Sequence, residues 1–253
     1  MIRATINYPA TGFLLAVIAI TFLNCGITKK SEIIEFSIIA DLTEDHHDVF
    51  TELDSITVQH LLHTSDQKQG VMFRLYGISD VRYNQVYTET LPATSELELN
   101  NFERVKERND FYRKINQDIQ HMKQDMHERK QSYVFFQIAQ AINDLAQSPT
   151  SSPKVLAIAS DLGQHEPLFS VFNNKDMGLL KKQPEKLMEK LDATYPLHNN
   201  IGNIHLFFVH RTNTKTDQTY HLMVNFLTTY LHQKGIQDIV QVSSFEDVVI
   251  PSK

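Results

Sequence analysis

A short apolar run that stops at a polar cluster, EFSIIADLTEDHHD at residues 35–48, constrains the fold of this chain more than any other stretch. Ile38 and Ile39 form the apolar centre, and Asp41, Thr43 and Asp45 follow at alternate positions. Such a run is typical of a buried parallel strand. In an open α/β sheet, ligands bind beyond the carboxyl ends of the strands. The stretch therefore predicts a strand that delivers these three polar side chains to a ligand-binding edge.

Strand and helix patterns alternate through the rest of the chain. They predict an α/β fold: a doubly wound, mostly parallel sheet with helices on both faces. A turn pattern at 77–80 predicts a hairpin, which places one antiparallel strand at an edge of the sheet. The predicted strands after the first are 71–76, 81–88, 154–159, 204–209 and 239–242, and the predicted helices are 49–64, 95–129, 132–146, 179–195 with a break at Pro184, and 216–233 closed by Gly235.

The segment at 95–129 is long for a globular helix. Its spacing predicts one packed face, with a break near Asn109 or His121. The alternative is an arm that binds a partner. The predicted apolar stripe consists of Phe102, Val105, Phe111, Ile115, Ile119 and Met122.

The amino-terminal segment has the pattern of an export signal. Arg3 gives a basic start, and the apolar residues 13–23 are too few to span a bilayer as a stable helix. Cys25 follows directly, and this position resembles the lipobox of bacterial lipoproteins, although Asn24 stands where a small residue is usual. The resemblance implies a signal peptide at 1–24, lipidation of Cys25, a tether at 25–32 and an exported domain at 33–253 anchored to a bacterial membrane. The alternatives are an uncleaved membrane anchor and an apolar segment of the core.

Composition narrows the class of partner. Acidic residues outnumber Lys and Arg by 30 to 24, a formal net charge of −6. This balance argues against nucleic acid as a partner, because phosphate binding requires a basic surface. Cys25 is the only cysteine, so an exported domain would have no internal disulfide and would depend on its core, for which the length is ample.

The order of these motifs resembles the von Willebrand factor A (vWA) fold. That family builds a metal-ion-dependent adhesion site from Asp-x-Ser-x-Ser after its first strand, a Thr before a later helix, and an Asp after its fourth strand. The resemblance implies that Asp41 and Thr43 take the first two positions, Asp45 the second serine position, Ser132 the threonine position and Asp161 the distal aspartate position. It further implies a divalent cation, Mg²⁺ with Ca²⁺ or Mn²⁺ as alternatives, and a protein partner in the cell envelope.

Asp45 departs from the family pattern in a way that changes the charge of the site. Asp41, Asp45 and Asp161 together supply −3 against an ion of +2. Hard oxygen ligands still suit Mg²⁺ or Ca²⁺. The attraction of the ion for an acidic partner should fall, because its charge is already neutralised. In the alternative interpretation, Asp45 points to solvent and caps the next helix.

The same residues partly fit other kinds of functional site. A divalent-metal hydrolase of a phosphorylated or ester substrate, with Asp41 and Asp161 around the ion, is the alternative function. A haloacid dehalogenase phosphatase would need a second aspartate where Thr43 stands. An EF-hand loop is rejected, because His46 replaces its glycine and a strand precedes it. A Ser-His-Asp hydrolase would need a Gly-x-Ser-x-Gly turn, which the sequence lacks.

Two further interpretations concern histidines and loops. A zinc site would pair His46 or His47 with His165 or His210, although neighbouring histidines on a strand face opposite sides. Alternatively, Asp41, Thr43 and Asp161 only stabilise loops and cap helices, without binding a metal, in a domain whose site is inactive.

Overall fold

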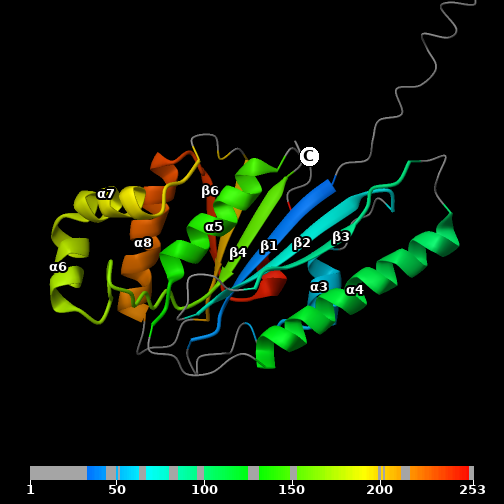
Figure 1. Cartoon of the computed structure of the whole chain (residues 1–253), viewed down its shortest axis with the longest axis horizontal. Coiled ribbons are helices and arrows are strands. Elements are labelled where there is room, and N and C mark those ends of the chain that lie inside the picture. Colours follow the sequence, from blue (N-terminus) through cyan, green and yellow to red (C-terminus); the bar gives the residue numbers. More distant parts are fainter. Residues whose placement is uncertain are drawn as a thin grey trace, which may run out of the picture. The chain divides into compact units, whose positions relative to one another are not determined.

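Within the part of the chain that the structure describes, six strands form one sheet in the order β3-β2-β1-β4-β5-β6 (Figure 1). All neighbouring strands are parallel except β2 and β3, which pair antiparallel at one edge. The predicted α/β fold, with its mostly parallel sheet and one antiparallel edge strand, is therefore confirmed. The strands are β1 (Ile33–Asp41), β2 (Gly70–Ile78), β3 (Tyr87–Leu91), β4 (Lys154–Ala159), β5 (Ile204–Val209) and β6 (Asp238–Val242).

The computed structural model describes residues 33–43, 50, 52–62, 67–79, 85–95, 100–124, 131–148, 153–198, 201, 203–211 and 217–250. The predicted signal peptide at 1–24, the tether at 25–32, and the residues Cys25, Asp45, His46 and His47 lie outside this set. None of the described helices has the length and apolar character needed to cross a bilayer.

Helices cover both faces of the sheet, as predicted (Figure 1). Side chains alternate along β1, so Ile39 belongs to one core cluster, while Phe36 and Ile38 belong to the other. The first face carries α5 (Val134–Gln147), α6 (Asn174–Lys182), α7 (Pro184–Thr194) and α8 (Asp217–Gln233), and the second carries α3 (Ser55–Leu61), α4 (Asn101–Gln124) and the short 3-10 helix η1 (Phe245–Asp247).

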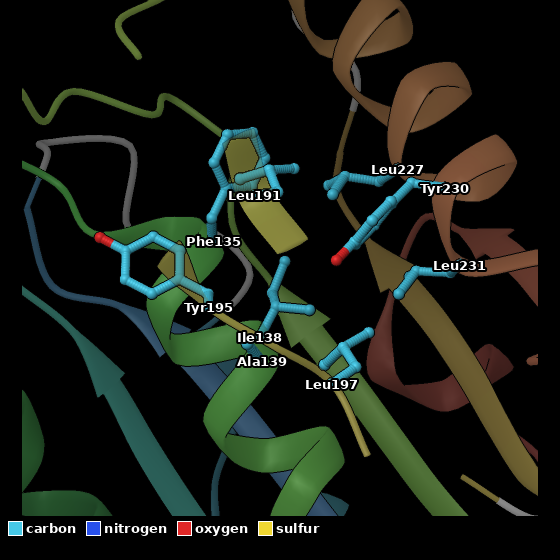
Figure 2. A pocket seen from close by; sticks show the side chains of 9 residues that line it. All are labelled: Phe135, Ile138, Ala139, Leu191, Tyr195, Leu197, Leu227, Tyr230 and Leu231. Atoms are coloured by element: carbon cyan, nitrogen blue, oxygen red, sulfur yellow. The ribbon is translucent and has the colours of Figure 1, made fainter. Parts of the chain in front are cut away.

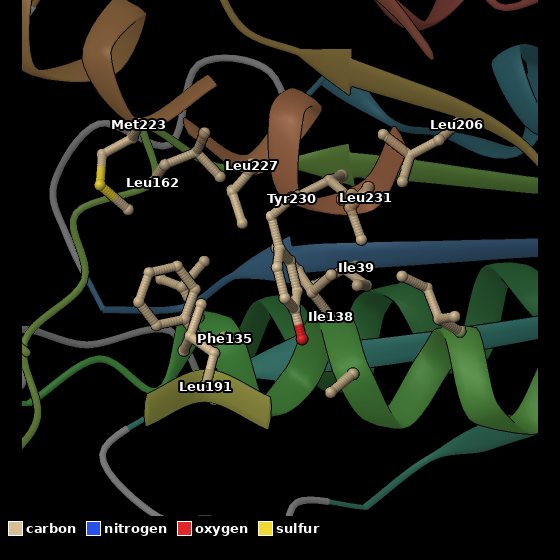
Figure 3. Packing of buried hydrophobic residues seen from close by; sticks show 14 of the residues in the cluster. Ile39, Phe135, Ile138, Leu162, Leu191, Leu206, Met223, Leu227, Tyr230 and Leu231 are labelled. Atoms are coloured by element: carbon tan, nitrogen blue, oxygen red, sulfur yellow. The ribbon is translucent and has the colours of Figure 1, made fainter. Parts of the chain in front are cut away.

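The core on the α5 face is apolar and closely packed. Figure 2 shows a gap between α5, α7 and α8 that is lined by side chains such as Ile138 and Leu227, and its free space of about 10 Å³ is room for roughly one water molecule. Figure 3 shows Ile39 and Leu206 of the sheet in the same cluster as Leu231 of α8. The gap is therefore a small packing defect of the core, too small to hold an organic ligand.

Three helix predictions need correction. Helix α4 runs unbroken over 24 residues, without the predicted interruption at Asn109 or His121. Its first turns do not follow the predicted stripe: Phe102 is 80% exposed and Val105 57% exposed, while Arg104 is buried. The helix predicted at 49–64 is shorter, since Asp54 caps the N-terminus of α3 by accepting a 2.8 Å hydrogen bond from the Thr57 amide.

Two local predictions are confirmed. Pro184 occupies the first turn of α7 and separates that helix from α6. Gly235 has φ of +99° just after α8, and its amide donates to the carbonyl of His232 at 3.1 Å. The backbone there is in the left-handed region that favours glycine, so the residue ends the helix as expected.

Candidate functional site

The site begins where β1 ends, at Asp41. The chain turns back immediately, and both the amide and the hydroxyl of Thr43 donate to Asp41 Oδ1, at 3.0 and 2.7 Å. An aspartate that accepts from the backbone two residues on is a common turn former. Thr43 is buried, so its hydroxyl is held beside the carboxylate and not in solvent.

The neighbouring strand β4 ends at the same level, because Ala40 of β1 pairs with Ala159 of β4. Ser160 follows that pair, and its hydroxyl donates to Asp41 Oδ2 at 2.7 Å while accepting from the amide of Leu162 at 2.9 Å. Both oxygens of Asp41 are thus held by hydroxyl groups from two adjacent strand ends. The carboxylate is fixed in one orientation.

Asp161 stands next to Ser160 and is fixed by its own turn. Its Oδ1 accepts from the amide of Gly163 at 2.7 Å, and Leu162 between them has a positive φ of 59°. A Cβ atom on Gly163 would come within 2.8 Å of Asp161 Oδ1, so only glycine fits this turn without displacing the carboxylate. The turn sequence therefore sets where the second acid of the site points.

The two carboxyl groups interact unfavourably. Burial raises the pKa of Asp41 above its ordinary value, and the negative charge of Asp161 raises that pKa further. Hydrogen bonds from Ser160 and Thr43 lower the pKa, but they do not offset the first two effects. The site holds more negative charge than its own hydroxyl groups stabilise.

Ser132 reaches the same edge from the segment before α5. Its backbone pairs with His165 through hydrogen bonds of 2.9 and 3.0 Å, and the next amide, of Tyr133, donates to the carbonyl of Ser79 at 3.2 Å. Ser79 follows β2 and His165 follows β4, while β1 lies between those strands. The segment at Ser132 therefore joins the loops that follow β2 and β4, the two strands on either side of β1.

The hydroxyl of Ser132 is the unusual feature of the site. It is buried, and among the described residues it has no hydrogen-bond partner. A buried hydroxyl without a partner costs about 1–3 kcal/mol, so most such groups are paired with protein, water or an ion. Its position beside an acidic edge makes a cation a suitable partner.

The donor set suits a hard cation. Two carboxylates and the hydroxyl groups of Thr43 and Ser132 are the oxygen ligands that Mg²⁺, Ca²⁺ and Mn²⁺ accept. Among the described residues, no cluster of three or more His, Cys, Asp or Glu side chains is placed to bind a metal ion. The candidate ligands at this edge are not such a cluster, because only two of them, Asp41 and Asp161, are acidic and the other two are hydroxyl groups. The chain's own residues fit a divalent cation at this edge.

The structure brings four of the five predicted ligands, Asp41, Thr43, Ser132 and Asp161, to one edge of the sheet. The fifth, Asp45, lies outside the described residues. Sequence reasoning missed the direct role of Ser160, which orients Asp41. The signal was present as a hydroxyl residue immediately before the aspartate at the end of a predicted strand.

The two described histidines of the zinc interpretation, His165 and His210, have other neighbours. His165 Nδ1 lies 2.7 Å from the hydroxyl of Ser170, and the His210 ring packs on Tyr220 with centroids 4.1 Å apart. The zinc interpretation would also need His46 or His47, which lie outside the described residues.

A polar hollow opens beside Ser132, in the loop between β4 and α6. His165, Ser170 and Asp176 are among its lining residues. Beneath it, Gln164 accepts a 2.9 Å hydrogen bond from the Phe135 amide at the start of α5 and donates to Glu166 at 2.6 Å, and Glu166 accepts from the hydroxyl of Tyr195. This buried chain of polar contacts fixes the loop that carries His165, and with it the position of Ser132.

Comparison with known proteins gives similarities of fold only. No protein-family model and no curated protein matches the sequence. The human COPII-coat protein Sec24c has a TM-score of 0.44 and 14% identity over 87% of this chain, which spans 30% of that protein chain. The pilus adhesin SpaC from Lactobacillus rhamnosus GG, in its open conformation, has a TM-score of 0.42 and 9% identity over 86% of this chain, which spans 29% of it.

Proposed function

We propose that this chain is a lipid-anchored envelope protein whose vWA-like domain binds another protein, with a divalent cation at a degenerate adhesion site. The proposal is supported by the position of Asp41, Thr43 and Asp161 at the carboxyl ends of β1 and β4, and by the Ser132 hydroxyl, which is buried and unpartnered among the described residues in a segment that pairs with the loop after β4. Strand order and the antiparallel edge strand agree with the vWA pattern.

The charges support a cation at this edge. Burial and repulsion from Asp161 raise the pKa of Asp41, and a divalent ion would offset both effects; it would also give the Ser132 oxygen a partner. When bound, the ion would act as a Lewis acid toward an oxygen ligand of a partner protein. Asp41, Thr43, Ser132 and Asp161 would hold it, while Ser160 would keep the Asp41 carboxylate in place.

The strength of partner binding depends on Asp45. With two carboxylates the ion would be neutralised, and with a third it would be over-neutralised and less attractive to an acidic group. Replacing Asp45 with serine restores the family pattern at that position. We expect Asp45→Ser to strengthen binding of a carboxylate-bearing partner if Asp45 is a ligand.

Calorimetry with Mg²⁺, Mn²⁺ and Ca²⁺ tests the cation site. Asp161→Ala should abolish binding. Asp176→Ala is the matched control, because Asp176 lines the polar hollow at the same edge but accepts from the Ser170 amide and lies outside the proposed ligand set. Absence of cation binding to the wild-type protein, or equal loss in both variants, would refute the site.

Capture of envelope proteins tests the interaction function. The wild-type protein should retain a partner in the presence of Mg²⁺ and release it with a chelator, and Asp161→Ala should not retain it. A partner that binds the wild type and Asp161→Ala equally would place the interface elsewhere on the domain. Membrane association and processing that are unchanged in Cys25→Ser would refute the lipid anchor.

A further inference from the structure

The first turns of α4 carry two apolar side chains that the fold leaves uncovered. Phe102 is 80% exposed and Val105 57% exposed. Residues three apart lie on one face of a helix, so the two side chains form a single apolar surface, which we call the α4 tip. The remainder of the helix packs normally through Phe111, Ile115, Ile119 and Met122.

Arg104 fixes the orientation of this tip. Its guanidinium donates to the carbonyls of Gln67, Gln69 and Pro92 at 2.9, 2.7 and 2.9 Å. Arg104 lies two residues after Phe102, which places their side chains on nearly opposite sides of the helix. Because Arg104 points into the protein, Phe102 points away from it.

The tip lies at the edge of the sheet where the parallel strands begin. Gln69 immediately precedes β2, and Ile33, the first residue of β1, pairs with Gly70 of β2. Helix side chains lean toward the helix N-terminus, so Phe102 and Val105 lean outward past this edge. Figure 1 shows α4 beginning on the side where the chain enters β1 and running toward the side where the strands end.

The chain length before β1 limits what can cover the tip. Cys25 lies eight residues before Ile33, so even a fully extended tether reaches about 29 Å. A lipid on Cys25 would therefore hold this edge close to the bilayer. Lys29 and Lys30 within the tether would favour a surface of anionic headgroups.

We propose that the α4 tip docks on the lipid bilayer, with Phe102 and Val105 entering the interface between headgroups and acyl chains. The inference rests on the proposed lipid anchor and adds an orientation to it. Apolar side chains at the end of a helix gain free energy by entering that interface, as the apolar faces of peripheral helices do. The domain would then stand on its strand-entry edge, with the candidate metal site at the opposite edge.

The absence of tryptophan from the sequence makes the test direct. Phe102→Trp introduces a single tryptophan at the tip, which can be excited selectively at about 295 nm, in the full-length lipidated protein reconstituted into vesicles of phosphatidylcholine and phosphatidylglycerol. The control is Phe172→Trp, because Phe172 is also exposed, at 68%, but lines the polar hollow beside Ser132 at the other edge. Neither substitution disturbs the core.

Lipids brominated in their acyl chains report contact with the bilayer. We expect them to lower the emission of Phe102→Trp roughly twofold, and to leave Phe172→Trp unchanged. Val105→Asp in the Phe102→Trp background should reduce the quenching, while flotation with vesicles persists through the lipid.

The outcomes separate this inference from the anchor on which it rests. Vesicle-bound protein with neither tryptophan quenched, or with both quenched equally, would overturn the docking of the tip and leave the anchor intact. Protein that carries no lipid by mass spectrometry and does not float with vesicles would overturn both. Flotation that is lost in Cys25→Ser would show that the lipid, and not the tip, supplies the main attachment.

Discussion

Two serines at the same edge of the sheet should respond to alanine substitution with opposite signs. Ser132 is buried, and its hydroxyl lacks a partner among the described residues, whereas the Ser160 hydroxyl donates to Asp41 and accepts from Leu162. In metal-free protein, Ser132→Ala removes a buried unpaired polar group, so we expect the free energy of unfolding to rise by about 1 kcal/mol. Ser160→Ala removes two hydrogen bonds and should lower it by about 2 kcal/mol.

Urea titrations with and without Mg²⁺ measure both effects. A bound cation stabilises the native state by RT ln(1 + [L]/Kd), where [L] is the free cation concentration, so the wild type should gain stability with Mg²⁺ and Ser132→Ala should gain less. Ser132→Ala should therefore be more stable than the wild type without Mg²⁺ and less stable than it with saturating Mg²⁺. Ser160→Ala should be less stable than the wild type under both conditions. Metal-free Ser132→Ala protein that is destabilised as much as Ser160→Ala would show that the hydroxyl has a partner, and the argument for a cation would lose its main support.

Three further predictions concern charge and backbone. The folded state binds the Asp41 proton more tightly than the unfolded state does, so this group's contribution to stability declines as pH rises from the ordinary value of 3.8 through its raised pKa. Asp41→Asn should remove that slope in a series of urea titrations taken upward in pH from 3.8. Arg104→Met should cost about 3–5 kcal/mol by urea unfolding, whereas Arg113→Met, at an exposed ion pair, should change stability by about 0.5 kcal/mol or less. Gly235→Ala should lower the free energy of unfolding by about 1–2 kcal/mol because of its φ of +99°.

The central strands were predictable because burial on both faces leaves a clear mark on the sequence. The edge strand predicted at 81–88 was wrong in its bounds, because β3 is Tyr87–Leu91 and its half-exposed side chains give no apolar run. Residues 154–159 and 204–209 are apolar runs of strand length, and both form strands with those bounds. The ends of two strands also indicated the candidate site, since Asp41 is the last residue of β1 and Asp161 comes two residues after β4. Parallel neighbours end at the same edge, so their adjacency followed from the fold class.

The orientation of the first turns of α4 and the position of Ser132 could not be predicted from the sequence, because both depend on contacts between distant segments. Phe102 and Val105 fit a helical stripe by spacing, but Arg104 takes the inward position because the loops before β2 and after β3 present three carbonyls to it. The sequence of the helix alone cannot predict these carbonyl acceptors, because they lie in other segments of the chain. Ser132 likewise owes its place to backbone pairing with His165, a residue on another loop.

In the proposed arrangement, one edge of the sheet would face the bilayer and the opposite edge would carry the metal site. β1 has Ile33 at one end and Asp41 at the other, and the steps between its 9 residues, at about 3.3 Å each, place the two ends roughly 26 Å apart. If the α4 tip rests on the bilayer, this strand alone holds the candidate metal site that far from the lipid surface. A partner carboxylate would then approach the cation from the aqueous side without competing with anionic headgroups. If Cys25 carries a lipid, the tether would keep the domain near the membrane, and the direction of β1 would place its acidic edge on the side away from the lipid.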